Sequence, residues 1–470
     1  MIVKKKLIIG VISLFTIVGC KVTAPYQRPE TEKHINLRDS MLIRDNVQKK
    51  EIVWKEIFSD PKLQRIINNA LINNIDQKIA IKNIEIAKLF VRQSKMAYYP
   101  QLDVYASAKK AKLAYPQGFG FFTDVNQFDL GASASWEIDL WGKLKHAKKI
   151  EAVRLLRTIE GKRMIETNIV ALAAEHYYQL ASLDQSLKIL EESRKLREKD
   201  VEVVKKLMAI GLTTSKDSDQ SNALLREVDL LILDAKQKIR ETENSLSLLT
   251  GGFPETIERS TLEQQNEISI FKESGIPISL LANRPDIREA ELAFQEKFEQ
   301  VNVSRTFFYP SLTLTAGGGF SSFQLKEFFN PISIFGNIAG GLTQPLLSKG
   351  KNKIRLQYSI LEKEKAYDLY IFSLAKASQE VSDALYVFEQ FGERKKIRKI
   401  QIDDLSRAKE SSISLLVNNY NTNYTDVLLA ERLLLESKLN ATNDALQEWM
   451  SVVKLYRALG GSWNEQKTIK

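Results

Sequence analysis

The feature that most constrains this chain is a plan of elements that occurs twice. In each half a helix-like stretch ends at an aromatic-proline step and gives way to alternating polar and apolar residues, as in "AYYPQLDVYASA" and "TFFYPSLTLTAG". Three landmarks recur at a nearly constant spacing of 208 to 210 residues: Pro100 and Pro310, Lys143 and Lys351, and Asp217 and Asp426. A constant offset between matching patterns indicates an internal repeat. The chain is therefore predicted to be a tandem duplication.

The alternating segments predict β-strands. From 128 to 140 the even-numbered residues are apolar, and the odd-numbered residues are acidic, serine or glycine. The same period of two follows each proline, so we predict β-hairpins at 100–140 and 310–347, with loops at 113–127 and 322–332. Strands of about ten residues with one apolar face are typical of membrane-spanning antiparallel strands.

Long helices fill most of the remaining chain. Asp60 and Pro61 supply an N-cap and a first helical residue for a helix running to about Tyr98. After each hairpin a proline-free helical pattern continues for some 67 residues, or roughly 100 Å, and then turns back. We predict two long antiparallel helical hairpins, at 143–249 and 351–459, whose turns lie near Gly211 and in "NNYNTN".

The N-terminus has the pattern of an export signal. Three lysines precede a short apolar stretch that ends at "IVGC", so residues 1–19 resemble a bacterial lipoprotein signal. Cys20, the only cysteine, would then be acylated, for example with palmitate, and become the new N-terminus. A disulfide within the chain is excluded. Removing residues 1–19 lowers the formal charge from +10 to +7, which over such a long chain gives little support for nucleic-acid binding.

These patterns divide the chain into six parts. They are a signal peptide at 1–19, an acylated tether and equatorial segment at 20–59, a first repeat at 60–250, a connecting equatorial segment at 251–283, a second repeat at 284–460, and a tail at 461–470. The fold class is α+β. Four strands cannot close a barrel in lipid, because open edges leave backbone groups without partners. Two copies give a filled eight-stranded barrel, whereas three give twelve strands with room for a lumen. We therefore predict a homotrimer.

Several motifs resemble the TolC-like outer-membrane efflux channels, in particular their OprM-type lipoprotein branch. The resemblance spans Cys20 to about Trp463, and its most specific parts are "WEIDLWGK" and "NRPDIREAE", with "APYQRP" and "NYTDVLLAERLLLESK" in support. It implies a trimeric 12-stranded β-barrel in the bacterial outer membrane, continued by an α-helical tunnel through the periplasm. It also implies two protein partners, a periplasmic adaptor and an inner-membrane efflux transporter.

The resemblance also assigns candidate site residues. The tunnel tip, where adaptor and gate meet, would comprise Gly211, Leu212, Thr213, Tyr420, Asn421, Thr422, Asn423 and Tyr424. Tyr420 stands where the family commonly has glycine, and Thr422 where relatives can have an acidic gate residue. Asp217, Asp219 and Asp426 lie close to the turns and could form an acidic ring around a threefold axis. The alternative is that Asp217 and Asp426 stabilise helix N-termini.

No catalytic chemistry is predicted. The three histidines, His34, His146 and His176, have no metal-site spacing, and no nucleophile or phosphate-binding motif is found. We therefore expect no enzyme activity, no metal and no cofactor except the covalent lipid on Cys20. The predicted function is passive conduction of drugs or other small molecules in multidrug-type efflux. The alternatives are a lipid-anchored periplasmic coiled-coil scaffold without a pore, and the same channel serving type I protein secretion or metal efflux.

The anchor assignment gives a first testable prediction. Cys20→Ser should abolish lipidation but leave trimer assembly intact, because apolar strands supply their own membrane affinity. Mass spectrometry of the mature N-terminus would detect the missing lipid, and native gels would report the assembly. Loss of all trimer in this variant would contradict the prediction.

Overall fold

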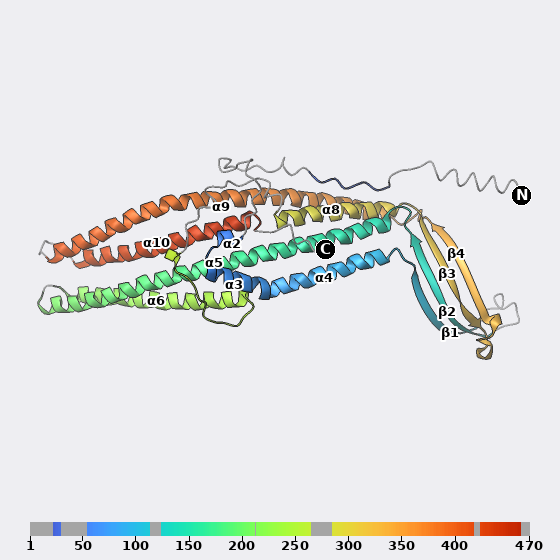
Figure 1. Cartoon of the computed structure of the whole chain (residues 1–470), viewed down its shortest axis with the longest axis horizontal. Coiled ribbons are helices and arrows are strands. Elements are labelled where there is room, and N and C mark those ends of the chain that lie inside the picture. The colour runs from blue at the N-terminus through green and yellow to red at the C-terminus, as the bar shows by residue number, and fades with distance from the viewer. Residues whose placement is uncertain are drawn as a thin grey trace. The chain divides into compact units, whose positions relative to one another are not determined.

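The structure is a computed structural model that describes residues 22–29, 54–112, 124–211, 213–264, 284–417 and 424–461 (Figure 1). In chain order the elements are α2 (Trp54–Ile57), α3 (Pro61–Asn73), α4 (Ile75–Met96), β1 (Gln101–Lys112), β2 (Asp124–Ile138), α5 (Lys143–Ala209), α6 (Ser215–Leu249), η3 (Leu262–Gln264), α8 (Pro285–Thr306), β3 (Ser311–Ser322), η5 (Leu325–Glu327), η6 (Pro331–Ser333), β4 (Ile334–Thr343), α9 (Lys351–Val417) and α10 (Tyr424–Ala458).

The duplication is visible in the helix lengths. Helices α5 and α9 have 67 residues each, α6 and α10 have 35 each, and α4 and α8 have 22 each. The chain forms two compact units, and each takes segments from both halves. The first unit lies within 22–29, 84–158 and 290–370, and the second within 54–83, 159–289 and 371–461. The two halves therefore interleave.

One four-stranded antiparallel sheet dominates the first unit. Its order is β1-β2-β3-β4, so the pairing of β2 with β3 joins the two predicted hairpins (Figure 1). Leu102, Ala134, Ala316 and Ile338 are successive partners across all four strands. Strand β2 begins at Asp124, inside the stretch predicted as loop, and β4 ends at Thr343. Among the described residues, neither edge strand has an outer partner.

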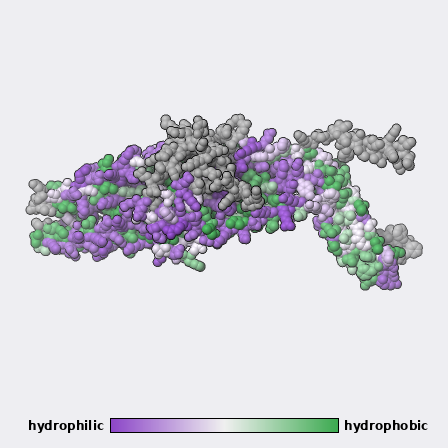
Figure 2. Space-filling view, in the orientation of Figure 1, coloured by the Kyte–Doolittle hydropathy of each residue, from purple (hydrophilic) through white to green (hydrophobic). Residues whose placement is uncertain are grey.

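One face of this sheet is apolar and exposed. Residues paired directly across strands share a face, so the even-numbered residues of the four strands form one continuous surface. Val104 is 75% exposed and Ile338 is 87% exposed. Figure 2 shows hydrophobic residues over most of the strands and hydrophilic residues over most of the helices. The other face carries polar groups, among them Asp103, Ser133 and Thr315.

Tryptophan side chains stabilise the steps from helix to strand. The indole of Trp136 donates to the carbonyl of Tyr98 at 2.9 Å, and that of Trp141 donates to the carbonyl of Pro310 at 2.7 Å. Carbonyls near a helix end have no partner within the helix, so these indoles supply one. In the same "WEIDLWGK" motif Lys143 forms an ion pair with Glu137 at 2.9 Å.

The helix predicted from Asp60 to Tyr98 is interrupted at Asn74. The backbone of Asn74 is extended, with φ −55° and ψ 136°, and it separates α3 from α4. Its side chain accepts from the amide of Gln77 at 3.2 Å and donates to the carbonyl of Leu249 at 3.0 Å. The signal for this break was present, because Asn followed three residues later by Gln is a capping-box pattern.

The second unit is built from packed helices. Residues of α5, α6 and α10 share one apolar cluster that includes Leu190, Val228 and Leu435. Near α2 and α3, Phe58 and Tyr178 are buried, and Tyr178 stacks on Trp449 with ring centroids 4.4 Å apart. Within the described parts of the chain, no helix combines the length and the hydropathy needed to cross a membrane.

Close approach of β2 and β3 generates a prediction about Gly319. A Cβ added there would lie 2.5 Å from the Cα of Gly131 and against the carbonyl oxygen of Leu130, whereas one added at Gly341 meets nothing within 4 Å. Gly319→Ala should separate the two hairpins and destabilise the sheet by about 1–3 kcal/mol. Thermal unfolding followed by circular dichroism would measure the change. Gly341→Ala is the matched control, and equal melting of both variants would contradict the prediction.

Candidate functional site: the turn end of the helical hairpins

The structure describes part of the predicted tunnel tip. Gly211 has φ +79° and ends the turn after α5, a conformation that glycine adopts without strain. Thr213 is half-buried, and Tyr424 is buried at the start of α10. Cys20, Leu212, Tyr420, Asn421, Thr422 and Asn423 lie outside the described residues, as does His34. Their predicted roles stay predictions.

The three candidate acidic residues have different environments. The carboxylate of Asp217 accepts from the backbone amide of Thr214 at 2.9 Å and from its hydroxyl at 2.8 Å. These hydrogen bonds lower the pKa of Asp217, which therefore stabilises the first turn of α6. Asp219 is exposed in the second turn of α6, and Asp426 is exposed in the first turn of α10. Asp217 thus stabilises a helix N-terminus, whereas the carboxylates of Asp219 and Asp426 are exposed to solvent.

Four helices meet beneath the turns in an apolar cluster, called here the tip cluster. It consists of Val204 from α5, Leu224 from α6, Leu416 from α9, and Tyr424 and Leu428 from α10. Val204 is fully buried. Because the cluster joins both helical hairpins, a displacement of either hairpin at this end has to separate its members.

Buried ion pairs follow the tip cluster along the helices. Glu431 of α10 bridges two cations, with Arg197 of α5 at 2.7 Å and Lys409 of α9 at 3.1 Å. Arg197 is only 3% exposed, so removing one partner would leave a buried charge uncompensated. These contacts connect α5, α9 and α10.

A second carboxylate lies beside this bridge. Burial and the negative charge of Glu431 raise the pKa of Asp200 to about 6, against the opposing effect of Arg197 and Lys409. One oxygen of Asp200, Oδ2, is buried and has no hydrogen-bond partner among the described residues. Burial also raises the pKa of Tyr424 to about 12, with Asp200 and Glu431 contributing. Asp200 therefore titrates near neutral pH in the part of the protein that joins the hairpins.

The sequence analysis missed this network, although a signal was present. Leu190, Arg197 and Val204 are separated by seven residues each, and all three are buried. Glu431 likewise follows the buried Tyr424 by seven residues. In a heptad repeat, the positions that face the neighbouring helix are normally apolar. A charged residue at such a position indicates an ion pair buried between helices.

The structure offers no metal site in the described residues, since no group of three or more His, Cys, Asp or Glu side chains is suitably placed. His146 is buried and pairs with Glu299 of α8. His176 is half-buried on α5, and burial lowers its pKa. Both histidines belong to the packing of their own units.

Comparison with known proteins identifies the family. The sequence model of the outer membrane efflux proteins matches residues 66–252 and 276–461. The chain belongs to the outer membrane efflux protein family. It is thus a TolC-like channel of the bacterial outer membrane, as the resemblance implied.

Individual relatives match over almost their whole length. The solvent efflux pump outer membrane protein SrpC of Pseudomonas putida is 26% identical over 464 residues, covering 96% of this chain and 97% of its own. The cation efflux system protein CusC of Escherichia coli strain K12 is 25% identical over 447 residues, covering 94% and 96%. The structure of the open Neisseria gonorrhoeae MtrE outer membrane channel superposes with a TM-score of 0.80 at 22% identity, covering 94% and 98%.

Asp200 gives a pH-dependent prediction. Its pKa is raised from 3.8 to about 6 in the folded protein, so folding favours the protonated form. Protonation of Asp200 therefore adds to the free energy of unfolding in full below about pH 4. This contribution declines as the pH rises through 6, and at higher pH the free energy of unfolding no longer changes with this group. The loss should be on the order of 1–2 kcal/mol, because solvent screens this partly exposed group. Amide exchange of 197–204 and 424–431, corrected for intrinsic rates, should show weaker protection at pH 7.5 than at pH 5.

The isosteric Asp200→Asn variant keeps the side-chain volume and cannot ionise. Its protection at the same amides should not change between pH 5 and pH 7.5. Asp219→Asn, at an exposed position of α6, is the matched control and should behave as the native protein. Persistent pH dependence in Asp200→Asn would assign the effect to another group.

Proposed function

We propose that three copies of this chain assemble into one channel that conducts small molecules passively across the outer membrane. The observation that carries the proposal is the four-stranded sheet, which has an exposed apolar face and, among the residues that the structure describes, no partner strand at either edge. In lipid each edge needs a hydrogen-bonding partner, and β4 of one copy can supply it to β1 of the next. Three sheets of four strands would close a barrel of twelve, wide enough for a lumen.

Aromatic residues border the apolar face at both ends of the strands. Trp136 and Trp141 lie near the helix end of the strands, and Phe320 packs on Phe328 and Phe329 near the hairpin end. Aromatic residues at both borders of an apolar band are typical of outer-membrane barrels.

Exposed apolar residues on two helices support the same assembly. Within the first unit, α5 is bound to α8 by Arg154 and Glu296 at 3.0 Å, and α8 to α9 by Lys297 and Glu362 at 3.2 Å. The outward residues of α4 and α9 are large, apolar and exposed: Ile86, Leu89 and Phe90 on α4, and Ile354, Tyr358 and Leu361 on α9. Large apolar residues in such rows indicate a surface that another subunit covers.

The segment that would follow the lipid anchor is bound along α8. The side chain of Asn302 pairs with both backbone groups of Ala24, at 3.0 and 2.9 Å, and Arg28 pairs with Glu291 at 2.8 Å. Only three residues separate Ala24 from Cys20. Acylation of Cys20 would therefore tether this unit to the membrane, within a short distance of α8.

We further propose that the turn end contacts a periplasmic adaptor, which links the channel to an inner-membrane transporter. The transporter would supply the energy. The candidate contact and gate residues are Gly211, Leu212, Thr213, Tyr420 to Tyr424, Asp217, Asp219 and Asp426. The names of the relatives refer to solvents for SrpC and cations for CusC. Our proposal for this chain is efflux of drugs or other small molecules.

Single-channel recording in planar bilayers tests the proposal, with native mass measured on the same sample. We expect discrete conductance steps from a trimer. Ile338→Lys places a charge on the apolar face, at an expected expense of about 2–4 kcal/mol, and should strongly reduce channel insertion. Ala339→Lys, the adjacent residue on the polar face, is the matched control and should still insert.

Because an efflux channel can be closed at rest, the recordings are repeated with Arg197→Gln, which removes an ion pair near the turn end. A monomer or dimer that does not conduct in either form would support the periplasmic scaffold. Equal insertion by Ile338→Lys and Ala339→Lys would show that the apolar face does not meet lipid.

A further inference from the structure

The exposed apolar face of the sheet carries charged residues at one end only. Among the even-numbered residues of the four described strands, the charged ones are Lys110 and Lys112 of β1 and Asp124 of β2. All three are exposed, and they lie at the hairpin end of their strands, away from the helices. Figure 2 shows hydrophilic residues at this end of the sheet, beyond the hydrophobic band. The charges thus lie at the border of the apolar face and not within it.

The two lysines continue the row of apolar residues along β1. Leu102 and Val104 begin this row, and Lys110 lies eight residues beyond Leu102. Eight residues span about 27 Å along a strand. At a strand tilt of about 40° this becomes about 20 Å along the membrane normal, against an apolar band of about 25 Å. A lysine stem can cover the difference and keep its ammonium group among polar groups. In a bilayer that covers this face, the ammonium groups therefore reach the lipid headgroups.

Aromatic residues lie between the apolar band and the lysines. Phe128 of β2 pairs with Ala108 of β1, one step of the same face before Lys110, and Phe320 of β3 lies on this face as well. Aromatic side chains favour the level where hydrocarbon chains meet headgroups. The face is therefore apolar, then aromatic, then cationic, which is the order of chains, interface and headgroup in a lipid.

Lys110 is not neutralised by its surroundings in the described part of the chain. Its direct partner across the strands is Asn126, which is uncharged. Lys112 is the direct partner of Asp124, so these two opposite charges offset each other. Neither lysine has an ion pair or a side-chain hydrogen bond among the described residues. With two lysines and one aspartate, this end of the face has a net charge of +1, centred on Lys110.

We propose that this end of the face, called here the lysine border, binds the phosphate of a phosphorylated lipid in the outer leaflet. Lys110 and Lys112 contact the phosphate, and an acyl chain lies along the small side chains of Ala106 and Ala108. The inference rests on the proposed function, because it requires that the apolar face meets lipid. Ammonium and phosphate groups form charge-assisted hydrogen bonds, which are the stronger kind.

Native mass spectrometry tests the inference on the full-length protein in an uncharged detergent, with lipid A as the probe. Lipid A carries phosphate on an acylated sugar, and phosphatidylcholine, whose phosphate is balanced by choline, is the comparison lipid. We expect saturable binding of lipid A in preference to phosphatidylcholine. Lys110→Gln should weaken the binding of lipid A about five- to tenfold, because one cation is lost. Lys110→Arg should retain it.

The matched control is Lys109→Gln, which removes the same charge from the adjacent residue on the polar face of β1. It should bind lipid A as the native protein does. Asp124→Asn removes the one negative charge from the lysine border and should strengthen the binding about two- to fivefold. Equal weakening by Lys109→Gln and Lys110→Gln would overturn the inference, since binding would then follow net charge alone. Unchanged binding in Lys110→Gln, or equal binding of the two lipids by the native protein, would also overturn it.

Conductance in phosphatidylcholine bilayers, measured on the same samples, separates this inference from the proposed function. A conducting trimer in which Lys109→Gln and Lys110→Gln bind lipid A equally would refute the lysine border and leave the channel intact. Selective binding of lipid A without conductance would support the lysine border and refute the pore. If the native protein neither conducts nor binds lipid A, both proposals fail.

Discussion

The backbone groups along β1 and β4 impose the constraint on which the rest of the assembly depends. In the described part of the chain, each edge strand has one side paired within the sheet and one side without a partner strand. In water such an edge can be hydrated, but in a bilayer the groups have to be paired, because no solvent is available. The exposed apolar face places this sheet in lipid, and the open edges then require further copies of the chain. In the assembly proposed above, the association of copies is thus a consequence of hydrogen bonding rather than an additional feature of the fold.

The motifs that carried the family resemblance prove to be structural contacts. In "WEIDLWGK" the tryptophan and the charged residues fix the step from strand to helix, and in "NRPDIREAE" Arg284 joins α8 to α9 and α10. In "APYQRP" the backbone of Ala24 is bound by Asn302, and Tyr26 packs against Phe298. These positions fix helices and strands to one another within each unit. Their specificity identifies the architecture, and it does not identify a cargo.

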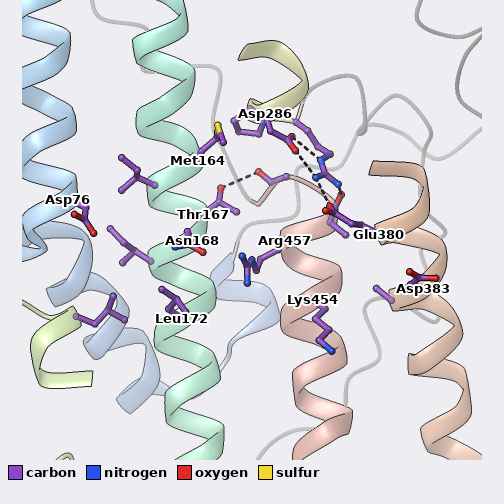
Figure 3. A pocket seen from close by; sticks show the side chains of 18 of the residues that line it. Asp76, Met164, Thr167, Asn168, Leu172, Asp286, Glu380, Asp383, Lys454 and Arg457 are labelled. Atoms are coloured by element: carbon purple, nitrogen blue, oxygen red, sulfur yellow. Dashed lines mark hydrogen bonds and ion pairs between the residues drawn. The ribbon is translucent and has the colours of Figure 1, made fainter. Parts of the chain in front are cut away.

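The charged side chains of possible functional importance lie outside these motifs, on other faces of the helices. The network of Arg197, Glu431 and Lys409 joins three helices near the turns, and Asp200 beside it titrates close to neutral pH. Lys454 and Arg457 line a cavity in the same unit (Figure 3) and remain exposed to solvent. Both sets occur within helices whose charged residues resemble a solvated surface when the sequence is considered alone. The difference between a solvated charge and a buried one depends on the neighbouring helix.

Sequence periodicity by itself determined the elements of this protein. The period of two at Phe128 to Leu140, the prolines at 100 and 310 and the offset near 210 residues specified the strands, the helices and their duplication, because these signals are local and depend on backbone geometry. Only the tertiary structure decided how β2 pairs with β3, why α3 ends at Asn74, and which charges are buried among α5, α9 and α10. Those outcomes depend on contacts between residues that are far apart in the chain. A local sequence pattern does not specify which distant residue a side chain contacts.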